Sequence, residues 1–184
     1  MAKRPKRGIV PTSSGTNSKA EPALCGERLD DTKNTKKVTI LAMDPGRKNF
    51  AWVERVGSET KRCGWIRPIV NVTDDTDFIN DCIEIFVKVR PDFVVLERFM
   101  VRGSGGQSKL AETLNQMIGR LVVLTRVFAF VELIQVTPAQ WKNWWTKGKG
   151  EDWHKVFAHL ESIHQRDAAG IGQYLEEHWI TKNL

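Results

Sequence analysis

Short apolar runs and longer helical repeats alternate along the chain after residue 37. Three consecutive runs joined by turn sequences predict antiparallel strands, at 38–44, 49–56 and 61–68. Two later runs are short and continuously apolar, as in central strands, at 92–97 and 131–138. Helical spacing of apolar residues predicts helices at 73–91 and 108–128, and the C-terminal third predicts further helices interrupted near 147–150.

Each of the two central helical segments predicts a buried stripe. The first stripe comprises Phe78, Ile79, Cys82, Ile83, Phe86 and Val87. The second comprises Leu110, Leu114, Met117, Ile118, Leu121 and Val122. Three antiparallel strands followed by strands reached through helical crossovers predict an α/β fold with a mixed five-stranded sheet flanked by helices. This is the element order of the ribonuclease H-like fold.

Composition and charge divide the chain into two parts. At 184 residues, it is long enough for one domain with a substantial core. The segment 1–37 carries nine Lys and Arg against four Asp and Glu, a net +5 of the chain's total +6, and is rich in Pro, Gly, Ser and Thr. We therefore predict a disordered basic tail at 1–37 and a folded domain at 38–184. The tail's basic start suits either a loose nucleic-acid arm or a solubilising leader.

The sequence also narrows the cellular setting. No apolar run approaches the roughly 20 residues of a membrane span, and no apolar block follows the basic N-terminus. Cys25, Cys63 and Cys82 are odd in number and lack Cys-x-x-Cys spacing, which disfavours a disulfide framework or a zinc knuckle. We expect a soluble intracellular protein without a membrane partner, in the cytoplasm or nucleoid, with an organellar location also open.

Acidic residues at the ends of two predicted strands suggest a metal site. Asp44 ends the first strand and Glu97 the fourth, so their carboxylates meet at one sheet edge if these strands are neighbours. His164 and Asp167, three residues apart on a predicted helix, share one face. Small residues follow them, which would let that helix approach the sheet closely. Hard oxygen ligands with one imidazole suit Mg²⁺ or Mn²⁺ rather than zinc.

Four motifs in order resemble the RuvC family of Holliday-junction resolvases: "MDPGRKNFAW", "VVLERFM", "VTPAQWK" and "HQRDAAGIG". The resemblance implies that Asp44 bridges two Mg²⁺ ions, for which Mn²⁺ can substitute. It implies that Glu97 and Asp167 complete their coordination and that His164 occupies a position held in relatives by His or a carboxylate. It further implies a homodimer that nicks four-way DNA junctions symmetrically, with segment 108–124 contributing to the dimer face.

Basic and aromatic residues near these motifs are candidates for DNA contacts. Arg98, Arg102 and Lys109 lie around a glycine-rich loop, and the resemblance adds Lys142 and a later lysine, Lys149 or Lys155, as phosphate contacts. Phe99 is the candidate for stacking at the junction centre, although it lies one residue closer to Glu97 than is usual in the family. Three tryptophans nearby are spaced as on one face of a helix: Trp141, Trp144 and Trp145. This spacing favours packing in the core over stacking on DNA bases.

Several alternatives stay open at this point. A ribonuclease H acting on RNA–DNA hybrids would use the same acidic edge, and a junction-binding protein without activity would need no acids. A sugar-kinase-like nucleotide binder fits least, because the chain has no room for its second lobe. His154, His159 and His164 recur every fifth residue, which does not place them on one helical face and predicts no second metal site.

Overall fold

The computed structural model describes residues 37–46, 50–69, 74–98 and 108–181. The predicted tail at 1–37 therefore lies almost entirely outside the described residues. The strands are β1 (Thr39–Asp44), β2 (Phe50–Val56), β3 (Glu59–Ile66), β4 (Phe93–Glu97) and β5 (Leu133–Val136). The helical elements are α1 (Thr76–Val89), α2 (Ser108–Leu124), η1 (Thr125–Ala129), α3 (Pro138–Asn143), η2 (Trp144–Lys149), α4 (Trp153–Val156), α5 (Ile163–Tyr174) and η3 (Leu175–Ile180).

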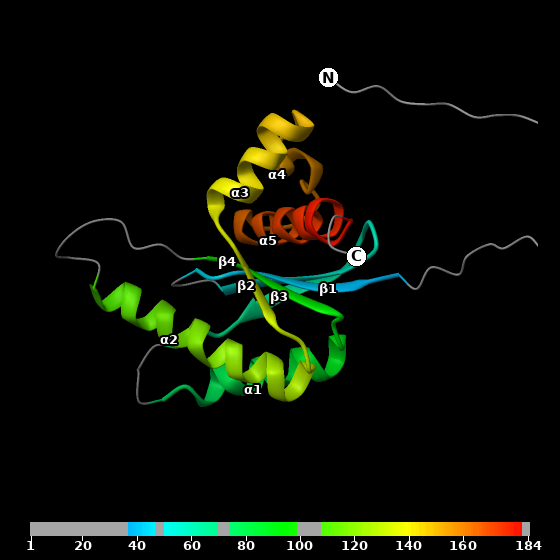
Figure 1. Ribbon diagram of the computed structural model, residues 1–184. Helices are drawn as coiled ribbons and strands as arrows, with labels where there is room; N and C mark the ends of the chain where they lie inside the picture. The colour runs from blue at the N-terminus through cyan, green and yellow to red at the C-terminus, as the bar shows by residue number, and fades with distance from the viewer. Residues whose placement is uncertain (1–36, 47–49, 70–73, 99–107, 182–184) are drawn as a thin grey trace, which may run out of the picture. The chain divides into compact units, whose positions relative to one another are not determined.

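The five strands form one mixed sheet in the order β3-β2-β1-β4-β5. β1 pairs antiparallel with β2 and parallel with β4, and β4 pairs parallel with β5. Helices α1 and α2 cover one face of the sheet, and α3, α4 and α5 lie on the other (Figure 1). This confirms the predicted α/β fold with helices on both faces. No helix among the described residues is long and apolar enough to cross a bilayer.

Alternation along the two central strands directs both strand-end acids to the same face. In β1, Leu41 and Met43 pack in the core toward α1 and α2, whereas Ile40 and Ala42 pack in the core that includes α5 residues. Asp44 continues the second set because side chains two residues apart share a face. In β4, Val95 belongs to the α5-side core, so Glu97 follows it to that face.

The predicted stripe of α1 is shifted from the observed one. The buried residues are Phe78, Cys82, Ile85, Phe86 and Val89. Val87, which the prediction placed in the core, is 55% exposed. The buried stripe is centred on the line through residues 78, 82 and 86 and includes residues 85 and 89 beside it. Residue 87 lies outside this stripe and faces solvent. In α2, Leu114, Met117 and Leu121 are buried as predicted, and the side chain of Leu110 lies outside the described part.

Helix α5 approaches the sheet closely because its inner face is small. A Cβ atom added at Gly172 would lie 2.6 Å from Arg55 Cδ and 3.0 Å from Ala42 Cβ. The Arg55 side chain cannot move aside easily, since it is 1% exposed and its Nη2 donates a hydrogen bond to Glu176 Oε2 at 3.1 Å. Glycine at position 172 therefore sets the distance between α5 and the β1–β2 pair.

We expect Gly172→Ala to destabilise the protein by about 1–3 kcal/mol, because the added methyl group overpacks a closed contact. Thermal denaturation followed by circular dichroism measures the change. Gly148→Ala in η2 is the control, because the nearest atom to its added Cβ, Trp144 Cδ1, lies at an ordinary van der Waals distance of 3.5 Å. That control should leave stability unchanged or raise it by up to about 1 kcal/mol. Equal melting temperatures for Gly172→Ala and wild type would contradict the close approach.

Candidate active site

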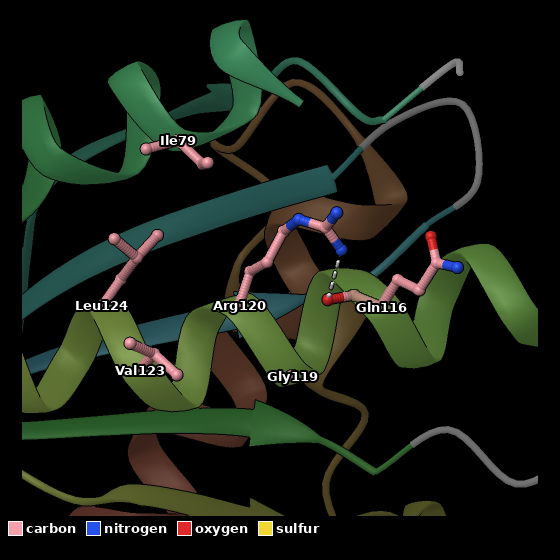
Figure 2. Close-up of a pocket in the computed structure, with 6 residues that line it drawn as sticks. All are labelled: Ile79, Gln116, Gly119, Arg120, Val123 and Leu124. Carbon is pink, nitrogen blue, oxygen red and sulfur yellow. Dashed lines mark hydrogen bonds between the residues drawn. The ribbon is translucent and has the colours of Figure 1, made fainter. Parts of the chain in front are cut away.

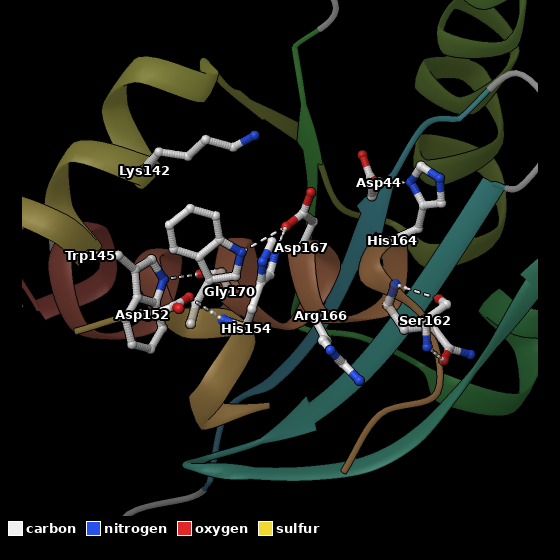
Figure 3. Close-up of polar contacts among 12 residues, drawn as sticks. Asp44, Lys142, Trp145, Asp152, His154, Ser162, His164, Arg166, Asp167 and Gly170 are labelled. Carbon is white, nitrogen blue, oxygen red and sulfur yellow. Dashed lines mark hydrogen bonds and ion pairs between the residues drawn. The ribbon is translucent and has the colours of Figure 1, made fainter. Parts of the chain in front are cut away.

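Asp44 stands at the end of β1 in a largely buried position, with 8% of its surface exposed. His164 Nδ1, from the first turn of α5, lies 2.7 Å from Asp44 Oδ2 (Figure 3). Burial raises the pKa of the Asp44 carboxyl above its ordinary value, and the negative charge of Asp167 raises it further. The hydrogen bond from His164 and the charge of Lys142 act in the opposite direction. A cation near Asp44 would therefore stabilise its ionised form.

Glu97 lies beside Asp44 because β1 and β4 are parallel and Met43 pairs with Leu96. Its Oε2 accepts a hydrogen bond from Trp141 Nε1 at 2.8 Å, and Lys142 Nζ is 4.0 Å from the same oxygen. Burial raises the pKa of Glu97, with additional raising contributions from the charges of Asp44 and Asp167. Lys142 and the Trp141 hydrogen bond oppose this shift. The two strand-end acids thus share one electrostatic environment.

Asp167 reaches the same environment from α5. The helix begins with a capping box, in which Ser162 accepts from Gln165 N–H and the Gln165 side chain accepts from Ser162 N–H. This start fixes the rotation of the helix, so that His164 and Asp167 both face the strand ends (Figure 3). Asp167 contributes to the raised pKa values of both strand-end carboxyls. The acids of β1, β4 and α5 therefore lie near enough for their charges to interact, and their role as metal ligands stays a prediction.

Two further side chains contact the Asp167 carboxylate, and neither contact was predicted from the sequence. Trp153 Nε1 donates to Asp167 Oδ1 at 2.7 Å, and His154 Nε2 lies 2.8 Å from the same oxygen. The spacing of His154 and His164 along one helix does not matter, because the two residues lie on different helices. His154 belongs to α4 and His164 to α5, and each contacts a different acid from its own helix. Only the density of tryptophans between residues 141 and 153 hinted at supporting indoles.

The tryptophan-rich segment forms core rather than a base-stacking surface at two of its positions. Trp141 and Trp145 are fully buried, which confirms the prediction of core packing for both. Trp145 Nε1 donates to the Gly170 carbonyl at 3.0 Å (Figure 3). A Cβ at Gly170 would lie 3.1 Å from Trp141 and 3.2 Å from Trp153. Glycine at position 170 therefore leaves room for the indoles of Trp141 and Trp153, which donate hydrogen bonds to Glu97 and Asp167.

The side chains at this site are of the types that bind divalent cations. Each of the three acids also contacts hydrogen-bonding side chains of the protein. Three carboxylates and one imidazole are the ligand types that Mg²⁺ and Mn²⁺ accept. In its contact with Asp44, His164 donates through Nδ1 to the carboxylate, which leaves Nε2 able to ligate. Among residues 37–46, 50–69, 74–98 and 108–181, no three His, Cys, Asp or Glu side chains lie close enough together to hold a metal ion as placed.

The predicted DNA-contact residues are only partly brought to this site. Lys142 reaches the acids, and Arg98 follows Glu97 directly with an exposed side chain. Lys149 instead pairs with Glu177, with 2.9 Å between Nζ and Oε2, and Lys155 is exposed on α4. The remaining predictions lie outside the described residues, or have side chains that do: Phe99, Arg102 and Lys109.

Comparison with known proteins gives a fold but no sequence family. No family model matches the chain, and no curated protein matches it. The structure of Thermus thermophilus RuvC in complex with a Holliday junction substrate superposes with a TM-score of 0.60 at 14% identity, covering 79% of this chain and 95% of RuvC. A second T. thermophilus RuvC structure gives 0.56 at 16% identity, covering 78% and 95% of the two chains.

A eukaryotic structure gives a similar result. The yeast mitochondrial Holliday junction resolvase Ydc2 superposes with a TM-score of 0.55 at 11% identity, covering 80% of this chain and 87% of Ydc2. These superpositions span most of each protein, so the likeness concerns the whole folded domain. The chain therefore has the ribonuclease H-like fold seen in RuvC and related Holliday-junction resolvases.

Proposed function

We propose that the protein is a structure-selective endonuclease that resolves four-way DNA junctions. The observation that carries the proposal is the approach of Asp44, Glu97 and Asp167 to one edge of a RuvC-like sheet, where the charge of Asp167 raises the pKa of both Asp44 and Glu97. A fold retained only for binding junctions would have no need to bury like charges together, since their repulsion works against folding. A DNA substrate would place the protein in the cytoplasm, nucleoid or an organelle.

Mg²⁺ is the proposed cofactor, with two ions per site and Mn²⁺ as a substitute. Asp44, Glu97, His164 and Asp167 are the residues that would hold it. When bound, such ions would activate water and stabilise the leaving oxygen of the phosphodiester. The protein's own contribution is positional. Trp141 orients Glu97, Trp153 and His154 orient Asp167, and His164 orients Asp44.

A panel of nucleic acids tests the proposed activity. Purified protein is incubated with a labelled four-way DNA junction, a duplex of the same sequence and an RNA–DNA hybrid, each with Mg²⁺ or with EDTA. We expect cleavage of the junction alone, and only with Mg²⁺. Preferential cleavage of the hybrid would identify a ribonuclease H instead, and binding of the junction without cleavage would identify an architectural protein.

We further propose that the protein acts as a homodimer through the face formed by α1 and α2. A groove of about 420 Å³ between these helices is lined by Ile79, Gln116, Gly119, Arg120, Val123 and Leu124 (Figure 2). Val123 is 60% exposed, and beyond it Val127 and Phe130 are 54% and 86% exposed. A second copy of the chain is the proposed occupant, because two symmetric incisions require two active sites.

The double substitution Val123→Glu with Val127→Glu is expected to convert the dimer to a monomer, because each added charge would be desolvated in the interface. Size-exclusion chromatography with light scattering measures the mass. The control is Val156→Glu, since Val156 is 45% exposed and belongs to α4, on the opposite face of the sheet. The control should remain dimeric. A wild-type protein that is monomeric at assay concentration, or a Val123/Val127 variant that stays dimeric, would contradict this interface.

A further inference from the structure

Lys142 places a positive charge against the acids while it remains accessible to solvent. It lies in the last turn of α3, and its side chain extends toward the side on which Asp167 and Asp44 lie (Figure 3). Its Nζ is 4.0 Å from Glu97 Oε2, and the side chain is 40% exposed. Lys142 also favours the ionised forms of both Asp44 and Glu97. The charge of Lys142 therefore lowers the pKa of two of the three acids.

The position of the ammonium group is defined by the protein as well as by the acids. Lys142 Nζ lies 4.9 Å from the centre of the Trp141 ring and 6.0 Å from that of Trp153. The two rings pack edge to face with 4.9 Å between centroids. These distances are within the range of cation–π attraction. The same two indoles donate hydrogen bonds to Glu97 and Asp167.

The backbone that carries Lys142 is also fixed. Helix α3 begins with a capping box between Thr137 and Gln140, and Pro138 occupies its first turn. Trp141, next to Lys142, is fully buried. The base of the lysine side chain is thus held, while its four-carbon stem can rotate. Rotation of this stem would carry the ammonium group away from Glu97 without any change in the helix.

We propose that Lys142 is the resident counter-cation of the acidic cluster and that a divalent metal displaces its ammonium group, which then binds the DNA backbone. The first half of this inference rests on the metal site proposed above, and the second half rests also on the proposed activity on DNA. A divalent ion at Glu97 would repel the ammonium group 4.0 Å from Glu97 Oε2, and the ion carries twice the charge of that group. The released ammonium would lie beside the acids, where the phosphate to be cut must bind.

The displacement couples metal binding to DNA binding. If metal frees Lys142 for a phosphate, metal must strengthen DNA binding, and DNA must strengthen metal binding by the same factor. Without Lys142, the metal has no protein cation to displace and should bind more tightly to the DNA-free protein. A lysine that only contacts DNA predicts no such change, so the two roles are distinguishable without any DNA.

The first experiment titrates Mg²⁺ into the full-length, DNA-free protein and follows the rise in melting temperature. Lys142→Met should reach half of its stabilisation at about five-fold lower Mg²⁺ than wild type, the lower end of typical coupling factors. Lys142→Arg should resemble wild type because it keeps the charge. Lys147→Met is the matched control, as Lys147 is an exposed lysine of η2. An unchanged or higher Mg²⁺ requirement for Lys142→Met would overturn the proposal.

The second experiment measures junction affinity by gel shift, in EDTA and in Ca²⁺, a hard cation that takes oxygen ligands. Denaturing gels confirm that the DNA is intact. Lys142→Met should match wild type in EDTA and bind several-fold more weakly than wild type in Ca²⁺. Equal loss under both conditions would overturn the displacement. If neither protein binds the junction, the proposed function fails, while the Mg²⁺ titration still decides the counter-cation role.

Discussion

Asp44→Asn is expected to abolish junction cleavage, with at least a ~1,000-fold loss, while the folded protein becomes no less stable at pH 7.5. The asparagine oxygen can still accept the hydrogen bond that His164 Nδ1 now makes with Asp44 Oδ2. What disappears is the negative charge that burial and Asp167 disfavour. Junction binding should persist, because lysines and arginines supply the phosphate contacts.

The pH dependence of that stability follows from the direction of the pKa shift. Because the pKa of Asp44 is raised in the folded state, its favourable contribution is present at low pH and is lost as the pH rises through the folded pKa. The stability advantage of Asp44→Asn should therefore be largest at neutral pH and shrink as the solution is acidified. Thermal denaturation between pH 4.5 and pH 7.5, at about half-unit steps, would reveal the trend.

Asp81→Asn is the matched control, with the opposite sign. Arg67 lowers the pKa of Asp81 through hydrogen bonds and charge, so this pair stabilises the fold above the unfolded pKa. The control should cleave normally and be less stable than wild type at pH 7.5. The difference should persist down to pH 4.5, because it is lost only as the pH falls below the unfolded pKa of about 3.9. Cleavage by Asp44→Asn within ten-fold of the wild-type rate, about 1.4 kcal/mol in barrier height, would remove Asp44 from the active site.

Asp167→Asn should also eliminate cleavage, whereas substitutions of its partners should only slow it. Asp167 Oδ1 accepts from Trp153 Nε1 and contacts His154 Nε2. Loss of such supporting hydrogen bonds typically costs about 10–100-fold in metal affinity or activity. We therefore expect His154→Ala to cleave about 10-fold more slowly at limiting Mg²⁺ and to recover partly as Mg²⁺ is raised.

A conservative substitution and a neighbouring histidine separate positioning from folding. His154→Gln keeps a donor near Asp167 and should restore part of the lost Mg²⁺ affinity. His159→Ala is the control, because His159 is an exposed residue whose ring contacts Phe157. Cleavage is measured against Mg²⁺ concentration for all variants. A deficit in His154→Ala that is the same at every Mg²⁺ concentration would argue against a role in orienting a metal ligand.

The placement of the acids at one edge of the sheet could be predicted from the sequence, because it depends only on where single strands end and on which strands are neighbours. Two apolar runs that end in Asp44 and Glu97 need only lie side by side and in parallel for the carboxylates to meet, and β1 and β4 do so. The spacing of His164 and Asp167 needs only a helix, which the capping box of α5 provides. Each inference depended on one element or one pair of elements.

The supporting residues could not be predicted because they depend on how several helices pack. Trp141 comes from α3, and Trp153 and His154 come from α4. The two indoles reach Glu97 and Asp167 because Gly170 lets them pack closely against α5. Nothing in a one-dimensional pattern distinguishes an indole that fills the core from one that also donates to a buried acid. The same limit explains α1, where periodicity located the helix but misplaced Val87.

The most direct test of the proposed function is cleavage of a supercoiled plasmid that extrudes a cruciform, compared with the same plasmid lacking the inverted repeat. A dimer that cuts both strands within one bound complex should convert the cruciform plasmid with Mg²⁺ directly to linear DNA, with paired incisions symmetric about the junction. Asp44→Asn should give neither linear nor nicked product. Incision of both plasmids at equal rates, or undiminished cleavage in EDTA, would contradict a metal-dependent junction resolvase.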